Sequence, residues 1–235
     1  MNKKYLAEIY ANLRDEADAL SFGPEVSHVY NPLSYAWDGF MKYLNFFPER
    51  ARVIFVGMNP GPWGMTQTGI PFGEIEAVKN FLGINEIEIT PPENQHHSYP
   101  VNGLFCRRSE VSGKRLWGLL KERFGSAEEF FHEHAVINYC PLLFIAENRN
   151  LTPDKLPKSK REELFALCDS CLKKVAEILQ PEFVVGIGNF AAKRAEKLSG
   201  AKIVKCLHPS PASPASNHDW AGKVTKQLID SGVWQ

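Results

Sequence analysis

Four short apolar runs alternate with stretches of helical periodicity, and they constrain the fold of this chain more than any other feature. The runs cover residues 52–56, 135–140, 183–188 and 202–207. Strands that alternate with helices build βαβ units, in which the strands are parallel and helices cover both faces of the sheet. The sequence therefore predicts an α/β fold, a three-layer α/β/α sandwich with a central four-stranded parallel sheet. Among the intervening helices we expect one that is capped by Ser112 and runs to about Phe124.

Length, charge and cysteine content narrow the class of protein. The chain has 235 residues, 44% of them hydrophobic, so we expect residues 1–235 to form a single domain. Its 27 basic and 27 acidic side chains cancel, so any binding to nucleic acid must come from a local patch, helix N-termini or backbone amides. No run approaches the roughly eighteen apolar residues of a membrane helix. The five cysteines have no framework spacing, which favours reduced thiols in the cytosol or nucleus.

Three of the four predicted strands lead into loops with a polar side chain close to a proline. Asn59 precedes Pro60 after the first strand, Asn138 lies near the end of the second, and His208 precedes Pro209 after the fourth. In open parallel sheets, ligands bind at the carboxyl ends of the strands. The sequence therefore predicts a functional site at this edge of the sheet.

The motifs in and around these loops are long and unusual in composition, which makes them more specific than a short glycine pattern. They read GMNPGPWGMTQTGIPFGE, SEVSGKRLWG, NYCPLLF, RNLTP and HPSPASP, and with YNPLSYAW they extend almost to the C-terminus. In these motifs the chain resembles the single-strand-selective monofunctional uracil-DNA glycosylases, within the uracil-DNA glycosylase superfamily. The resemblance implies the uracil-DNA glycosylase fold and hydrolysis of the bond between uracil N1 and deoxyribose C1′, which leaves an abasic site. It implies no cofactor and no metal.

Asn59 offers an amide where most enzymes place a carboxylate. The glycosidic bond can break before water attacks, and the cationic sugar that results needs a well-positioned water more than a strong nucleophile. The side-chain oxygen of Asn59 can accept a hydrogen bond from that water. In the family, the histidine that matches His208 donates a hydrogen bond to uracil O2 as negative charge builds there. Taken alone, an Asn before Pro more often caps a turn, and a single His satisfies a turn about as often as it acts.

The resemblance also implies a base pocket. Asn138 is the expected base reader, because its amide complements uracil at N3-H and O4, and cytosine inverts both groups. Phe72 matches the position that stacks on the flipped base, although a lone Phe is usually core. Gly61 matches a position where related enzymes carry a bulky side chain against C5, which implies tolerance of 5-hydroxymethyluracil. Met58 matches a position whose backbone amide, more than its side chain, belongs to the base pocket in the family.

The segment HPSPASPASN lies between a strand and a helix, and its prolines limit its freedom. In the family this segment enters the duplex as a wedge. The resemblance therefore predicts contact with DNA, single- or double-stranded, by Pro209, Ser210, Pro211, Ala212, Ser213 and Pro214. Ala212 departs from the vertebrate pattern, in which an Arg is common, and that departure bears on how strongly the wedge holds an abasic product.

Other signals carry less weight. Cys168 and Cys171 form a CxxC, yet they share a helical apolar stripe, which favours core packing over a redox or cluster site. His96 and His97 have no carboxylate at ligand spacing. Arg107 and Arg108 are as consistent with solvated side chains as with phosphate contacts.

Two alternatives stay open: an N-glycoside hydrolase of free nucleosides or nucleotides, and a non-catalytic binder of damaged or single-stranded DNA. We expect a monomer without a membrane partner. Its compartment should be the cytoplasm, near the nucleoid, in a prokaryote, or the nucleus in a eukaryote.

Overall fold

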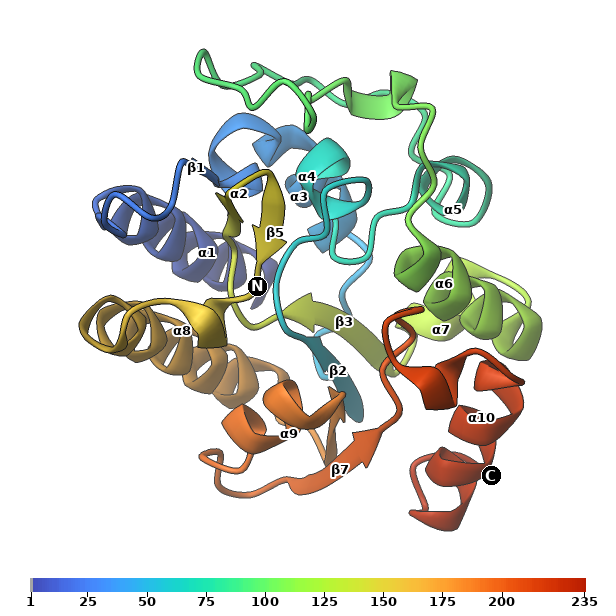
Figure 1. Cartoon of the computed structure of the whole chain (residues 1–235). Helices are drawn as coiled ribbons and strands as arrows, with labels where there is room; N and C mark the ends of the chain where they lie inside the picture. Colours follow the sequence, from blue (N-terminus) through green and yellow to red (C-terminus); the bar gives the residue numbers. More distant parts are fainter. Residues whose placement is uncertain (1) are drawn as a thin grey trace.

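A four-stranded parallel sheet lies at the centre of the protein in the computed structural model, which describes residues 2–235 (Figure 1). Its strands are β2 (Val53–Gly57), β3 (His134–Asn138), β6 (Phe183–Ile187) and β7 (Lys202–Cys206), in the spatial order β3-β2-β6-β7. All four predicted strands are thus confirmed. β2, β3 and β6 are buried along their whole length, as expected for strands of a parallel sheet that helices cover on both faces.

Helices cover both faces of this sheet, which confirms the predicted three-layer sandwich. Figure 1 shows α1, α8 and α9 on one side and α6, α7 and α10 on the other. The helices are α1 (Asn2–Asp18), α2 (Pro32–Tyr35), α3 (Trp37–Leu44), α4 (Met65–Thr68), α5 (Ile75–Asn80), α6 (Val111–Phe124), α7 (Ala127–Phe131), α8 (Lys158–Leu179), α9 (Asn189–Ala195) and α10 (Trp220–Asp230). Short 3-10 turns occur at Gly103–Phe105, Pro153–Lys155 and Pro214–Ser216.

Helix α6 begins earlier than the sequence predicts, and the expected cap at Ser112 is wrong. Glu110 occupies the N-cap position with an extended backbone, and its side chain makes no capping hydrogen bond. The carboxyl group instead turns toward the loop after β2, so a contact with a distant segment overrides the local capping preference.

A second sheet, antiparallel and outside the sequence prediction, has the order β1-β4-β5. It consists of β1 (His28–Tyr30), β4 (Leu143–Ala146) and β5 (Arg149–Leu151), with only 3, 4 and 3 residues. Runs this short carry too few residues for a periodic pattern to identify. Because β4 follows β3 closely, pairing of β4 with β1 fixes the course of the loop after Asn138.

One hydrophobic cluster extends from Leu6 on α1 to Trp234 near the C-terminus, and it includes Cys168 and Cys171. The interpretation of this CxxC as core packing is confirmed, and burial raises the pKa of the Cys171 thiol to about 12. Between residues 2 and 235 we find no helix that is both long enough and apolar enough to span a bilayer.

Candidate active site

Parallel pairing brings the polar side chains that follow the strands to one edge of the sheet. Gly57 at the end of β2 lies opposite Asn138 at the end of β3. The pairing continues into the loops, because Tyr139 N-H donates to the Gly57 carbonyl and Cys140 N-H donates to the Met58 carbonyl, both at 2.9 Å. These bonds therefore tie the backbone of Met58, in the loop that carries Asn59, to the loop that follows Asn138.

His208 reaches the same edge from β7, on the far side of β6. Gly188, which follows β6 with φ of +86°, makes this approach feasible. A Cβ on Gly188 would lie 3.2 Å from Cβ and Cδ2 of His208, so the imidazole packs directly on the glycine backbone. A larger residue at position 188 would displace the ring and would also be strained at this φ.

Asn59 is half-buried, and its amide nitrogen is directed at neighbouring carbonyls. Nδ2 donates to the Leu142 carbonyl and to the Pro60 carbonyl, each at 3.3 Å. Both contacts use the nitrogen, so Oδ1 is left available as a hydrogen-bond acceptor. The contact with Leu142 also ties the side chain to the loop that follows Asn138.

Asn138 carries a buried acceptor that has no partner. Its side-chain oxygen Oδ1 makes no hydrogen bond to any of residues 2–235, and the residue is only 8% exposed. Nδ2 lies 3.2 Å from the Met65 thioether, a weak acceptor. Native proteins rarely leave a buried polar atom unpaired, so this oxygen marks Asn138 as a residue equipped to bind a donor from outside the chain.

Phe72 meets Asn138 above Gly57. A Cβ on Gly57 would lie 2.4 Å from Asn138 Oδ1 and 2.5 Å from Cε2 of Phe72, so the amide and the phenyl ring converge on the same glycine. Phe72 has a φ of +54°, which is unusual for a bulky residue. Trp117 on α6 stabilises this conformation, because its Nε1-H donates to the Phe72 carbonyl at 3.1 Å.

Glu110 fills the space beside two glycines of the loop after β2. A Cβ on Gly61 would lie 2.2 Å from Glu110 Oε2, and a Cβ on Gly64 would lie 2.3 Å from it. Burial and the nearby Glu74 carboxylate raise the pKa of Glu110 to about 7, which favours the protonated carboxyl group. The sequence reading of Gly61 as open space is therefore incomplete, since a carboxyl group lies where its side chain would point. Acceptance of 5-hydroxymethyluracil stays a prediction.

Gln67, like Glu110, supports the site although the sequence does not indicate such a role. It is fully buried, and its Nε2 donates to the carbonyls of Pro62 at 2.9 Å and Pro100 at 3.0 Å. Its Oε1 accepts the Asn102 N-H at 2.8 Å. Gln67 thus joins the loop that carries Asn59 to the irregular segment around residue 100. No sequence signal identifies this role, because it depends on contacts between distant segments.

The surroundings of His208 fix its protonation. Burial lowers its pKa from the ordinary 6.5, so the ring is neutral at neutral pH. The backbone N-H of Ser210 donates to Nδ1 at 3.0 Å, which leaves the single ring proton on Nε2. The side chain is therefore a neutral hydrogen-bond donor through Nε2.

The segment after His208 is anchored at both ends and exposed between them. Arg115 on α6 donates to the Pro209 carbonyl at 2.8 Å, and the buried Ser216 hydroxyl donates to the His208 carbonyl. Ser213 N-H closes a turn on the Ser210 carbonyl at 3.0 Å. The exposed residues of the segment are Pro211, Ala212, Pro214 and Ala215. Pro209 is buried, whereas the other five residues predicted to contact DNA, Ser210 to Pro214, form a short protrusion beside His208.

No cluster of three or more His, Cys, Asp or Glu side chains is arranged to hold a metal ion within residues 2–235. His96 and His97 stack on each other, and His96 Nε2 lies 2.7 Å from Asn148 Oδ1. This pair is occupied by contacts within the protein.

Comparison with known proteins identifies the family of this chain. The uracil DNA glycosylase superfamily matches residues 44–228. The single-strand selective monofunctional uracil-DNA glycosylases of Bos taurus and Rattus norvegicus are each 41% identical over 228 residues, which cover 94% of this chain and 84% and 82% of theirs.

A crystal structure of the SMUG2 protein of Pedobacter heparinus has the same fold. It superposes with a TM-score of 0.67 at 18% identity and covers 97% of this chain and 99% of its own. The match of sequence over nearly the whole chain, together with this fold, shows that the chain belongs to the single-strand-selective monofunctional uracil-DNA glycosylases, within the uracil-DNA glycosylase superfamily.

Proposed function

We propose that this protein excises uracil from DNA by hydrolysing the bond between uracil N1 and deoxyribose C1′. The observation that carries the proposal is the unpaired Oδ1 of Asn138, which lies buried against Phe72 at the carboxyl edge of the sheet. An enzyme that acts on one base within DNA must extrude it from the stack and identify it by hydrogen bonds and stacking. Asn138 and Phe72 supply these two interactions.

Asn138 selects uracil over cytosine. Uracil N3-H donates to Oδ1, and uracil O4 accepts from Nδ2, which gives up its weak contact with Met65. Cytosine offers an acceptor at N3 and a donor at N4, so both amide groups of Asn138 would be buried without partners. Sites that reject a substrate by leaving polar groups unpaired discriminate far more strongly than apolar contacts do.

Cleavage then proceeds by departure of the base before attack by water. The electron pair of the N1–C1′ bond passes to uracil, where charge builds on O2, and the Nε2-H of His208 donates a hydrogen bond to that oxygen. Asn59 Oδ1 holds the water that attacks C1′, and the water proton passes to solvent. Water replaces any lysine amine as nucleophile, so the enzyme leaves an intact abasic strand.

The protrusion of residues 210–214 favours DNA over a free nucleoside, because a free nucleoside has no stack to fill. We extend the proposal to uracil in both single- and double-stranded DNA, and to 5-hydroxymethyluracil as a second substrate base. We also propose that the enzyme is active as a monomer with one domain. The larger hydrophobic cluster, which extends from Leu6 to Trp234, supports one domain.

The proposal is tested with a uracil-containing oligonucleotide that is incubated with the protein and then cleaved with alkali at abasic sites. Strand cleavage that depends on uracil supports it. Tight binding without base release would identify a damage-binding protein. Hydrolysis of free deoxyuridine as efficient as that of uracil in DNA would identify a nucleoside hydrolase.

The protrusion should matter most where a base stack exists. We expect replacement of Pro211, Ala212, Ser213 and Pro214 by glycine to lower excision from duplex DNA at least about tenfold more than excision from single strands, because only the duplex stack needs filling. His208 and its anchor Ser210 stay unchanged in this variant. Single-turnover rates on matched duplex and single-stranded substrates measure the difference, and an equal loss on both would assign the segment to the catalytic pocket.

Excision should be independent of metal ions, since the proposed steps need no Lewis acid. We expect full activity after dialysis against EDTA, measured in the same alkali assay. Loss of activity that one added divalent ion restores would overturn the proposed chemistry.

A further inference from the structure

We propose that a surface formed by Trp63, Phe105, Arg107 and Arg108, here called the aromatic–arginine surface, binds the unpaired DNA strand that flanks the flipped nucleotide. This inference rests on the proposed action on DNA, and it assigns the path of the strand outside the base pocket.

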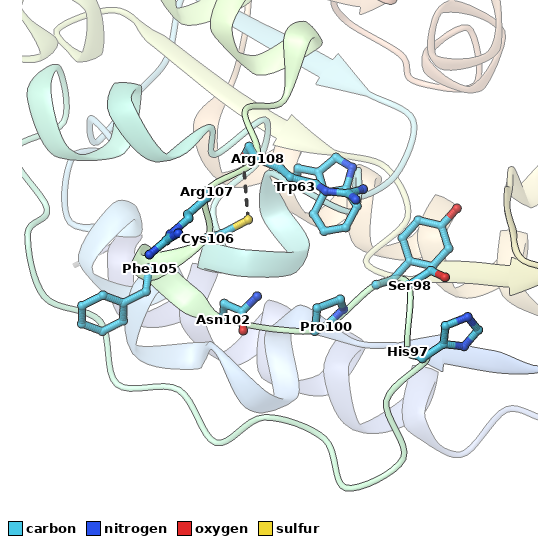
Figure 2. Close-up of a pocket in the computed structure, with 10 residues that line it drawn as sticks. Trp63, His97, Ser98, Pro100, Asn102, Phe105, Cys106, Arg107 and Arg108 are labelled. Carbon is cyan, nitrogen blue, oxygen red and sulfur yellow. Dashed lines mark hydrogen bonds between the residues drawn. The ribbon is translucent and has the colours of Figure 1, made fainter.

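The aromatic–arginine surface borders a cavity of about 570 Å³ that neither Asn59 nor His208 lines (Figure 2). In Figure 2, Phe105 and Arg107 lie on one side of the cavity and Trp63 with Arg108 on the other, while Pro100 and Asn102 form the wall between them. A cavity volume of this size is typical of small-molecule pockets and is sufficient for a nucleobase.

Phe105 is unusual in its exposure. Its side chain is 90% exposed, whereas the next most exposed large hydrophobic side chain in residues 2–235, Tyr5, is 50% exposed. Phe105 ends the short 3-10 turn Gly103–Phe105, so its backbone has a defined course. An exposed phenyl ring on an ordered turn offers a flat face on which a base can stack, whatever its identity.

The two arginines supply positive charge that the protein does not neutralise. Both are exposed, and neither forms an ion pair with a carboxylate of residues 2–235. The Arg108 guanidinium lies 4.4 Å from the Trp63 ring centroid, and Tyr99 stacks on Trp63 at 5.7 Å. This stack orients Arg108 without an acidic partner, so its donors remain free for phosphate. Because the whole chain has a net charge of zero, such a local patch is what attraction to DNA requires.

The surface is continuous with the catalytic loop. Trp63 belongs to the same loop as Asn59, and Gln67 fixes Pro62 of that loop to Pro100 in the cavity wall. A strand whose flipped nucleotide contacts Asn59 would therefore pass onto Arg108, which Trp63 holds in place, and onto Phe105. The partner is an unpaired strand because stacking on Phe105 needs a base whose face is open, and in a duplex both faces are covered.

The test compares binding of single-stranded oligonucleotides that carry 2′-fluoro-2′-deoxyuridine, which resists cleavage because fluorine disfavours a cationic sugar. One substrate has both flanks, and two others lack the 5′ or the 3′ flank. We expect native protein to lose at least about tenfold in affinity when one particular flank is removed. The Phe105→Ala/Arg107→Ala variant should bind the full strand more weakly than native protein does, and should lose most of the sensitivity to that trimming, with Arg108 accounting for what remains.

Salt dependence gives a second measurement. Loss of one arginine–phosphate contact should flatten the plot of log Kd against log salt by about 0.7 for a single strand. The kcat of the variant on a cleavable substrate with both flanks should equal that of native protein. Lys4→Ala/Tyr5→Ala is the matched control, since it removes an adjacent exposed cation and ring from α1, and it should change none of these values.

Equal weakening of full and trimmed strands, or unchanged affinity, overturns the inference. Equal weakening on a fully paired duplex also overturns it, since the surface would then hold phosphate only. If native protein shows the flank-dependent affinity but releases no base from cleavable uracil-DNA, the proposed catalytic function fails while this binding assignment stands.

Discussion

Replacement of Asn59 by alanine is expected to lower the rate of uracil excision at least about 100-fold while leaving the affinity for uracil-containing DNA close to native. Alanine removes the oxygen that holds the attacking water, and positioning of a reactant contributes several kcal/mol to catalysis. The base contacts of Asn138 and Phe72 are untouched, so binding persists. Single-turnover excision and equilibrium binding, measured on the same oligonucleotide, separate the two effects.

Asn59→Asp is the informative companion variant. A carboxylate retains an oxygen at the same position and accepts a hydrogen bond from water, although it loses donation to the Leu142 carbonyl. We expect it to recover most of the activity that alanine loses. Near-native excision by Asn59→Ala would refute the assigned role, and a variant that also fails to bind DNA would point to a role in holding the loop.

His208→Ala should reduce kcat by about 100- to 1,000-fold, the usual effect of removing one preorganised donor from a developing negative charge. The donor matters only as charge reaches uracil O2, so KM should change little. His218→Ala is the matched control, because His218 is an exposed histidine in the same connection between β7 and α10. If the kcat of His208→Ala is within tenfold of the native value, His208 is not the proposed hydrogen-bond donor.

The pH dependence of the same step follows from the lowered pKa of His208. A histidine whose pKa is lowered is mainly neutral at pH 6.5, where an ordinary histidine is half protonated, and it gains its proton at lower pH. Protonation turns Nδ1 into a donor and removes its hydrogen bond from Ser210, so the ring loses its orientation. The activity ratio of native enzyme to His208→Ala should therefore be constant at neutral and higher pH and should fall on the acid side.

The sequence predicts those parts of the molecule that depend on local pattern. The four strands of the central sheet are apolar runs, and the apolar stripe of Cys168 and Cys171 on α8 has helical spacing, so both patterns can be recognised without any partner segment. The strands β1, β4 and β5 are too short for this, since only their pairing with each other defines them. Asn59, Asn138 and His208 were predictable as neighbours because parallel strands bring their carboxyl ends to one edge.

The contacts of Gln67 and Glu110 were not predictable, for a physical reason. Each connects the loop after β2 to a segment far along the chain, and neither residue lies in a periodic pattern. The glycines at 61 and 64 signal that something approaches closely, but the sequence alone does not identify the Glu110 carboxyl group as the neighbour. The tertiary fold therefore adds the supports of the site, whereas the sequence predicts its reacting groups.

The unpaired oxygen of Asn138 has a consequence for the thermal stability of the empty enzyme. A buried acceptor without a partner costs about 1 to 3 kcal/mol, against a total folding stability of roughly 5 to 15 kcal/mol for a domain. A uracil ring that donates N3-H to this oxygen removes the cost, so the melting temperature rises when the pocket is occupied. Because a ligand that binds only the folded state stabilises it, the melting temperature measured with and without uracil becomes a readout of whether this oxygen is paired.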